Sequence, residues 1–127
     1  MGYAPEFKKQ GEYSPLDLIA GDFPLKSESI TVEAGQVLKR GSVLGKKTAG
    51  GKFVLSVKLT ADDKPIADGS EKPLRVLAED IDATAGDLPT IAYKTGSFFA
   101  GGLTLGKGHT IESVKPDFET RSIFIEG

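Results

Sequence analysis

Short apolar runs and alternating polar positions dominate the chain from residue 29 onward, a pattern typical of β-strands. In SITVE (29–33), Ile30 and Val32 fall on one face, and the residues beside them are polar. Large apolar residues at every second position predict a strand over residues 53–59, namely Phe53, Leu55, Val57 and Leu59. The pair Gly50-Gly51 precedes this strand and predicts a tight turn that feeds into it.

Turn-forming residues divide the rest of the chain into further short segments. Glycines at 35, 41 and 45 bracket apolar runs, and residues 61–73 form a polar loop that contains two prolines. Strands are predicted over residues 73–81, 89–99 and 121–127, with a turn at 83–87. The strand over 89–99 is expected to run into or through a tight turn.

Only the last quarter of the chain favours helices. One short candidate lies near residues 99–105. Another begins at Thr110, an acceptable N-cap, and places Ile111, Val114 and Phe118 at helical spacing. Pro116 is expected to limit or break this second helix, because proline lacks the backbone N–H that the helix interior needs. The pattern therefore predicts a mainly β fold with a minor helical part.

The composition fits one domain that needs no metal or disulfide bond. The 127 residues include 16 glycines and 7 prolines, more than a helical bundle tolerates. There is no cysteine, which excludes a disulfide framework, a thiolate zinc site and a cysteine nucleophile. The net charge of −2 offers no basic footprint for nucleic acid and no polybasic membrane anchor. We therefore expect neither nucleic acid nor a membrane as a partner.

Residues 1–24 differ from the remainder and are predicted to be a flexible N-terminal arm on a single domain formed by residues 25–127. The arm contains three prolines, and its two lysines against four carboxylates give it a charge of −2, which leaves the domain formally neutral. Its second half, SPLDLIAGDFPL (14–25), is rich in large apolar residues, for which a merely solvated tail has little use. We expect the arm to dock, either on its own domain or on a partner.

Three motifs suggest an enzyme or a carrier domain. The triplet Lys94-Thr95-Gly96 occurs in β-lactam-binding serine enzymes, but no serine here has lysine three positions later, as that chemistry requires. GKKTAGGKF (45–53) lacks the glycine spacing and the hydroxyl of a Walker loop, and it predicts a hairpin turn. AGQVLKRGSVLG (34–45) resembles biotinyl and lipoyl carrier domains, in which Lys64 would be the modified residue, although no methionine flanks it. The carrier hypothesis remains the weakest alternative.

The single histidine and the acidic residues do not predict a chemical site. His109 lies in GKGHT, which suggests an exposed loop, and no second imidazole or thiolate accompanies it. Four carboxylates, Glu79, Asp80, Asp82 and Asp87, could bind a hard cation weakly, but neighbouring carboxylates on a strand point to opposite faces. We predict no catalytic, cofactor-binding or metal site. The remaining classes of function are binding and a structural role.

Three segments, in order and spacing, resemble the head decoration proteins of tailed bacteriophages, the lambda-type capsid-stabilising family. They are GQVLKRGSVLGKKTAGGKFV (35–54), DGSEKPLRVLAEDIDATAGD (68–87) and AYKTGSFFAGGLTLGKGHT (92–110), and the closing RSIFIEG also fits. The resemblance covers roughly residues 25–127. It implies a small, mainly β domain of the β-clip type, with a small barrel or ribbon, a minor α/β part and an extended N-terminal arm.

The resemblance also implies a function and its partners. Such proteins form homotrimers at the three-fold and quasi-three-fold positions of the expanded head, where they act as cement between major capsid subunits against the pressure of packaged DNA. We therefore expect a non-enzymatic protein on the outer surface of the virion that is present in the host cytoplasm during assembly. An alternative is another non-enzymatic phage β module, such as a tail or fibre adaptor or a surface-binding domain.

The arm is the expected capsid contact. An extended arm that adds as a strand to the major capsid protein gains main-chain hydrogen bonds, while alternate apolar side chains enter pockets. The residues expected to make this contact are Tyr13, Leu16, Leu18, Ile19, Phe23, Leu25 and Ile30.

Overall fold

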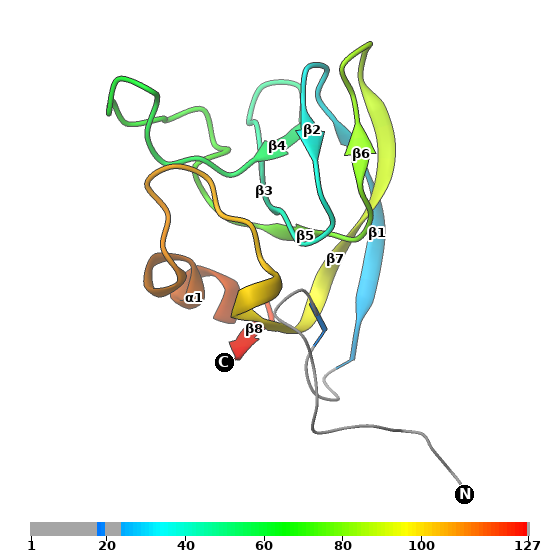
Figure 1. The fold of residues 1–127 in the computed structure, drawn as a ribbon, viewed down its shortest axis with the longest axis vertical. Helices are drawn as coiled ribbons and strands as arrows, with labels where there is room; N and C mark the ends of the chain where they lie inside the picture. The colour runs from blue at the N-terminus through cyan, green and yellow to red at the C-terminus, as the bar shows by residue number, and fades with distance from the viewer. Residues whose placement is uncertain (1–17, 20–23, 127) are drawn as a thin grey trace, which may run out of the picture.

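A computed structural model describes residues 18–19 and 24–126 of the chain. The described elements follow the chain in the order β1 (Lys26–Val32), β2 (Val37–Leu38), β3 (Val43–Lys46), β4 (Phe53–Leu55), β5 (Arg75–Leu77), β6 (Ile81–Asp82), β7 (Leu88–Phe99), η1 (Ala100–Gly102), α1 (Ile111–Glu119) and β8 (Ile123–Glu126) (Figure 1). The mainly β fold with a minor helical part is confirmed.

Five of the strands close into a small barrel. They follow the order β1-β4-β3-β5-β7, and β7 pairs again with β1 to complete the circuit. The closure is uneven, because β1 pairs with β7 along its whole length but with β4 only where Val32 lies opposite Phe53. Strand β8 extends the sheet beyond β7, and β2 and β6 form a separate ribbon.

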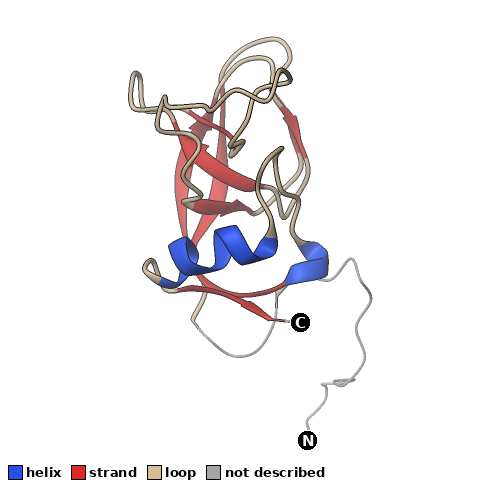
Figure 2. Ribbon diagram, turned by 90° about the vertical axis from the view of Figure 1, so that its left-hand side faces the viewer, coloured by secondary structure: helices blue, strands red, loops and turns tan. Residues whose placement is uncertain are grey.

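The core has two parts, one inside the barrel and one beneath the helix. Figure 2 shows α1 lying across one end of the barrel. Val114 and Phe118 face inward from this helix and are fully buried. Their cluster consists of Leu18, Val43, Val76, Phe98, Val114, Phe118, Ile123 and Ile125. The barrel cluster consists of Ile30, Val32, Leu38, Leu44, Phe53, Leu77, Ala83 and Ala92.

Gly96 marks the point where β7 changes partners. Up to Thr95 the strand pairs with β1, and from Gly96 to Phe99 it pairs in parallel with β8. The backbone at Gly96 has φ +148, and a Cβ atom there would lie 2.5 Å from Cδ2 of Leu25. Glycine meets both demands because it has no side chain. The chain thus runs through this position as a strand. The triplet Lys94-Thr95-Gly96 is part of β7, where it serves the packing of the strand.

Two of the expected elements differ from the structure for clear physical reasons. The strand predicted over 53–59 ends at Leu55. The N–H of Ser56 still donates to the carbonyl of Val43 in β3, but the N–H of Lys58 donates to the carbonyl of Lys107 instead. Pro116 was expected to limit or break the last helix, yet it lies inside α1. The proline costs one intrahelical hydrogen bond, while burial of Val114 and Phe118 on either side of it holds the turn in place.

The other predicted strands and helices occur at the expected positions, but some of them have different lengths. The strand expected over 73–81 is two short strands, β5 and β6, and the helix expected near 99–105 is the 3₁₀ turn η1. The hairpin turn at Gly50-Gly51 is confirmed, with positive φ at both glycines and antiparallel pairing of β3 with β4. Short strands depend on long-range partners, which local periodicity does not contain.

Candidate functional site

The segment Leu18-Ile19 adds to the edge of β7 and anchors the chain that precedes β1. The N–H of Phe99 donates to the carbonyl of Leu18 at 2.7 Å, and Ile19 forms an antiparallel bridge with Phe98. Since β8 pairs with the same residue from the other side, β7 lies between the two segments here. Of the two expected docking modes, the described part of the arm therefore docks on its own domain.

The next described residues are also held on β7. The hydroxyl of Thr95 donates to the carbonyl of Pro24 at 2.9 Å, and Leu25 covers the bare backbone of Gly96. Leu25 nevertheless remains 42% exposed and Ile19 36% exposed. Figure 1 shows that this segment, β8 and the C-terminal end lie at the same end of the molecule. This end, which we call the base, presents exposed apolar side chains where the chain enters the fold.

The seven residues expected in the capsid contact divide into three groups. Leu18 and Ile30 are buried in the two core clusters, with 2% and 6% exposure. Ile19 and Leu25 are exposed at the base. Tyr13, Leu16 and Phe23 lie outside the described residues. Of the expected contact residues that the structure describes, Ile19 and Leu25 are thus the two whose apolar side chains are exposed.

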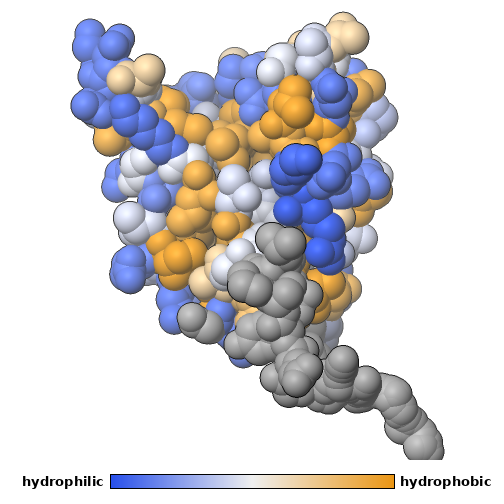
Figure 3. Space-filling view, viewed as in Figure 1, coloured by the Kyte–Doolittle hydropathy of each residue, from blue (hydrophilic) through white to orange (hydrophobic). Residues whose placement is uncertain are grey.

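A second apolar surface lies away from the base. Figure 3 shows apolar side chains gathered across the face seen in Figure 1, below the polar loop at its upper left. A groove of about 520 Å³ separates that loop from β4, and its apolar lining includes Leu55, Val57, Leu59 and Ile66. Charged residues, among them Lys47 and Lys107, form its rim. The described domain therefore exposes apolar side chains both at the base and in this groove.

Comparison of the chain with models of known protein families finds a match. The family model described as bacteriophage lambda head decoration protein D matches residues 12–121. The chain belongs to this family. A search of curated proteins finds no match to the chain. The resemblance found in the sequence is confirmed, and family membership supports a structural role in decorating a phage capsid.

The match to the head decoration family includes the anchor and ends before β8. It begins at residue 12, ahead of Leu18-Ile19, and continues into the segment between α1 and β8. It therefore covers both the arm's attachment to β7 and all five strands of the barrel. No helix among residues 18–19 and 24–126 is long and apolar enough to cross a membrane.

His109 of this head decoration family member lies in the expected loop, where Lys107, Gly108 and Thr110 are exposed, but its own side chain is less exposed than expected. It is half-buried, and its Nε2–H donates to the carbonyl of Glu71 at 2.9 Å, which fixes the proton on Nε2 because a carbonyl only accepts. The hydroxyl of Ser56 lies 3.2 Å from the same nitrogen, and that of Ser113 lies 3.4 Å from Nδ1. Burial lowers the pKa of His109, with a further contribution from Lys58. The imidazole thus contacts three segments of the chain, around Ser56, Glu71 and Ser113.

The four carboxylates considered as a cation site each have a separate partner. Glu79 accepts from the hydroxyl of Thr90, Asp80 accepts from the N–H of Arg40, and Asp82 accepts from the N–H and hydroxyl of Thr84. Asp87 binds Lys52 and the N–H of Ala34. These bonds lower the pKa of Asp82, through the Thr84 hydroxyl first, and that of Asp87, through Lys52 first. In the described parts of the chain, no group of three or more metal-ligating side chains gathers.

Two of the three lysines in the loop that resembled a phosphate site, Lys47 and Lys52, also form ion pairs. Lys47 lies 2.8 Å from Glu33, and Lys52 lies 2.6 Å from Asp87. These pairs fasten the β3–β4 hairpin to the loop after β1 and to the start of β7. The sequence missed this because the partners lie far apart along the chain. For Leu18, the apolar content of the segment left docking on its own domain open beside docking on a partner, but without a periodic signal it could not show which leucine enters the core.

Proposed function

We propose that this protein is a cement protein that binds the outer surface of the expanded phage head and stabilises it against the pressure of packaged DNA. The observation that carries the proposal is the family match over residues 12–121. The base supports it, because it presents Ile19 and Leu25 where the arm meets the domain. The partner is the major capsid protein.

In this proposal the arm binds by strand addition. Residues 1–17 precede the anchor, and an extended segment gains main-chain hydrogen bonds when it joins the edge of a capsid sheet. Tyr13, Leu16 and Phe23, together with exposed Ile19 and Leu25, supply the apolar contacts. The anchor on β7 supports this role, because it starts the arm from a fixed point and raises its effective concentration at the capsid.

The proposed assembly is a homotrimer at three-fold and quasi-three-fold positions, formed from protein made in the host cytoplasm. A trimer presents three arms to a fixed lattice, so weak contacts combine into firm attachment. Analytical ultracentrifugation tests this assembly, because it measures the mass of the protein free in solution and after its release from heads. Both masses should be three times that of the chain. A monomer that saturates heads would overturn the trimer while leaving capsid binding intact.

Two truncations test the arm. Removal of residues 1–17 spares the Leu18 anchor, whereas removal of 1–24 also takes away a core side chain. We expect the full chain to co-sediment with expanded heads and not with unexpanded ones. The 1–17 truncation should keep its thermal stability and lose affinity for heads. Unchanged affinity of this truncation would overturn the arm, and failure of the full chain to bind expanded heads would favour the tail or fibre adaptor instead.

A further inference from the structure

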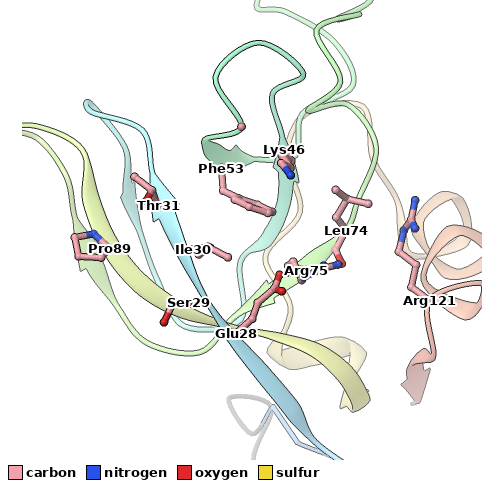
Figure 4. Close-up of a pocket in the computed structure, with 11 residues that line it drawn as sticks. Glu28, Ser29, Ile30, Thr31, Lys46, Phe53, Leu74, Arg75, Pro89 and Arg121 are labelled. Carbon is pink, nitrogen blue, oxygen red and sulfur yellow. Dashed lines mark hydrogen bonds and ion pairs between the residues drawn. The ribbon is translucent and has the colours of Figure 1, made fainter.

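A polar cleft opens through the wall of the barrel beside β1. It has a volume of about 620 Å³, and its lining comes from the middle of β1 on one side and from β3, β4 and the start of β5 on the other. Figure 4 shows Glu28 reaching from β1 toward Arg75, with Lys46, Leu74 and Arg121 along the opposite side. The cleft lies where the barrel is incompletely closed, and it is distinct from the arm.

One side of the cleft is an unpaired strand edge. The N–H of Glu33 donates to the carbonyl of Phe53, so residue 33 directs its backbone toward β4. Backbone groups of successive residues in a strand point to opposite edges. Thr31 therefore directs its N–H, and Ser29 both its N–H and its C=O, toward the same edge. Among the described residues, no strand pairs with this edge before Val32.

The opposite side of the cleft is cationic. Arg75 already binds the carboxylate of Glu28. Lys46 and Arg121 form no ion pair with any described residue, and an adjoining pocket shares both of them and adds Lys72. The Glu28–Arg75 pair shows within the molecule that a carboxylate suits this place. The formal neutrality of the domain conceals this local excess of positive charge.

The floor of the cleft is apolar. Ile30 and Phe53 are buried beneath it, and Leu74 is half-buried at its side. An exposed strand edge beside apolar pockets is the arrangement that accepts an added strand, since main-chain bonds give affinity and alternate side chains give selectivity.

We infer that this cleft binds an extended acidic segment of a partner protein, which adds as a strand to the free edge of β1 and places its carboxylates on Lys46 and Arg121. The free N–H and C=O groups select a peptide backbone, and the cations select its charge. A nucleic acid would use the cations but would leave the strand edge unpaired. This surface goes beyond the proposed function, because the domain accepts a strand here, whereas its arm donates one.

The probe is a fluorescent, end-blocked peptide of alternating glutamate and valine, measured by fluorescence anisotropy with the full chain. We expect it to bind, to weaken as salt rises, and to outcompete a matched peptide of lysine and valine. Equal binding of the two peptides, or no binding of the acidic one, would overturn the inference.

Two sets of variants separate charge from strand addition. Lys46→Glu and Arg121→Glu should each weaken binding by about fivefold or more, and Lys39→Glu, a charge reversal outside the cleft, should not. The second set alters the peptide and uses the native protein. N-methylation of the peptide amides that face β1 should abolish binding, and N-methylation of the alternate amides should preserve it. Equal effects of the two methylation patterns, or equally tight binding of a single-stranded DNA oligonucleotide, would mean a general anion surface and would overturn strand addition.

Discussion

Replacing Leu18 by alanine tests whether the arm is anchored in the core. The side chain is 2% exposed and packs within the cluster beneath α1. The substitution removes three buried carbons, which at about 0.8 kcal/mol each is about 2.4 kcal/mol of transfer free energy. A cavity adds to this cost, while relaxation of a segment held by few bonds reduces it. We expect a loss of about 2.5 kcal/mol in the free energy of unfolding.

The assay is urea unfolding together with calorimetry at one fixed protein concentration, since the Tm of a self-associating protein depends on concentration. With an unfolding entropy of about 2 cal/mol/K per residue, the loss corresponds to a fall in Tm of about 9 °C. Ile19→Ala is the matched control, because its side chain is 36% exposed and adjacent in sequence. Its cost should stay below about 1 kcal/mol. If the two variants agree within about 0.5 kcal/mol, Leu18 is not a core residue.

Three further substitutions test other parts of the structure. Burial lowers the pKa of His109 below 6.5, so the unfolded chain takes up the proton first, and the stability from neutral His109 is complete above pH 6.5 and lost as pH falls through the folded pKa. Urea unfolding from about pH 7.5 to about pH 5 should therefore show a smaller loss for His109→Gln than for the native chain, and equal losses would contradict this. Thr110→Ala removes the capping box of α1 and should cost about 1 kcal/mol in chemical unfolding, whereas no loss would mean the cap is idle. Gly45→Ala would drive a Cβ into the carbonyl of Ser70 and should lower Tm far more than Gly86→Ala, where the space is open; similar Tm values would refute the close approach.

Local features of the fold could be predicted because their causes are local. The turn at Gly50-Gly51 needs two positive φ angles, and only the sequence of that turn decides this. Thr110 starts α1 because its hydroxyl accepts from the N–H of Ser113, three residues away. The alternation of Ile30 and Val32 likewise shows which face of β1 enters the barrel.

Features that depend on distant partners could not be predicted. His109 looked exposed because GKGHT contains only small and polar neighbours, yet the carbonyl that it binds belongs to Glu71, 38 residues away. The end of β4 likewise involves a distant partner, because the N–H groups of Lys58 and Leu59 donate to the carbonyl of Lys107 rather than to β3. Strand length in a small barrel is set by such tertiary contacts more than by propensity.

The anchor at Leu18 and Ile19 changes what the proposed arm must do on binding. Without it, every residue before β1 would be ordered at the capsid, at a cost of roughly 1–2 kcal/mol for each backbone fixed. With it, Leu18 and Ile19 are held on β7 before any encounter, so the ordering cost falls only on the remaining arm residues. In the proposed mode of binding, the buried leucine lowers the ordering cost without touching the partner. Sequence reasoning left two docking partners open for this segment, its own domain and a capsid protein, because the position of Leu18 in the core depends on β7 and α1, which lie far along the chain.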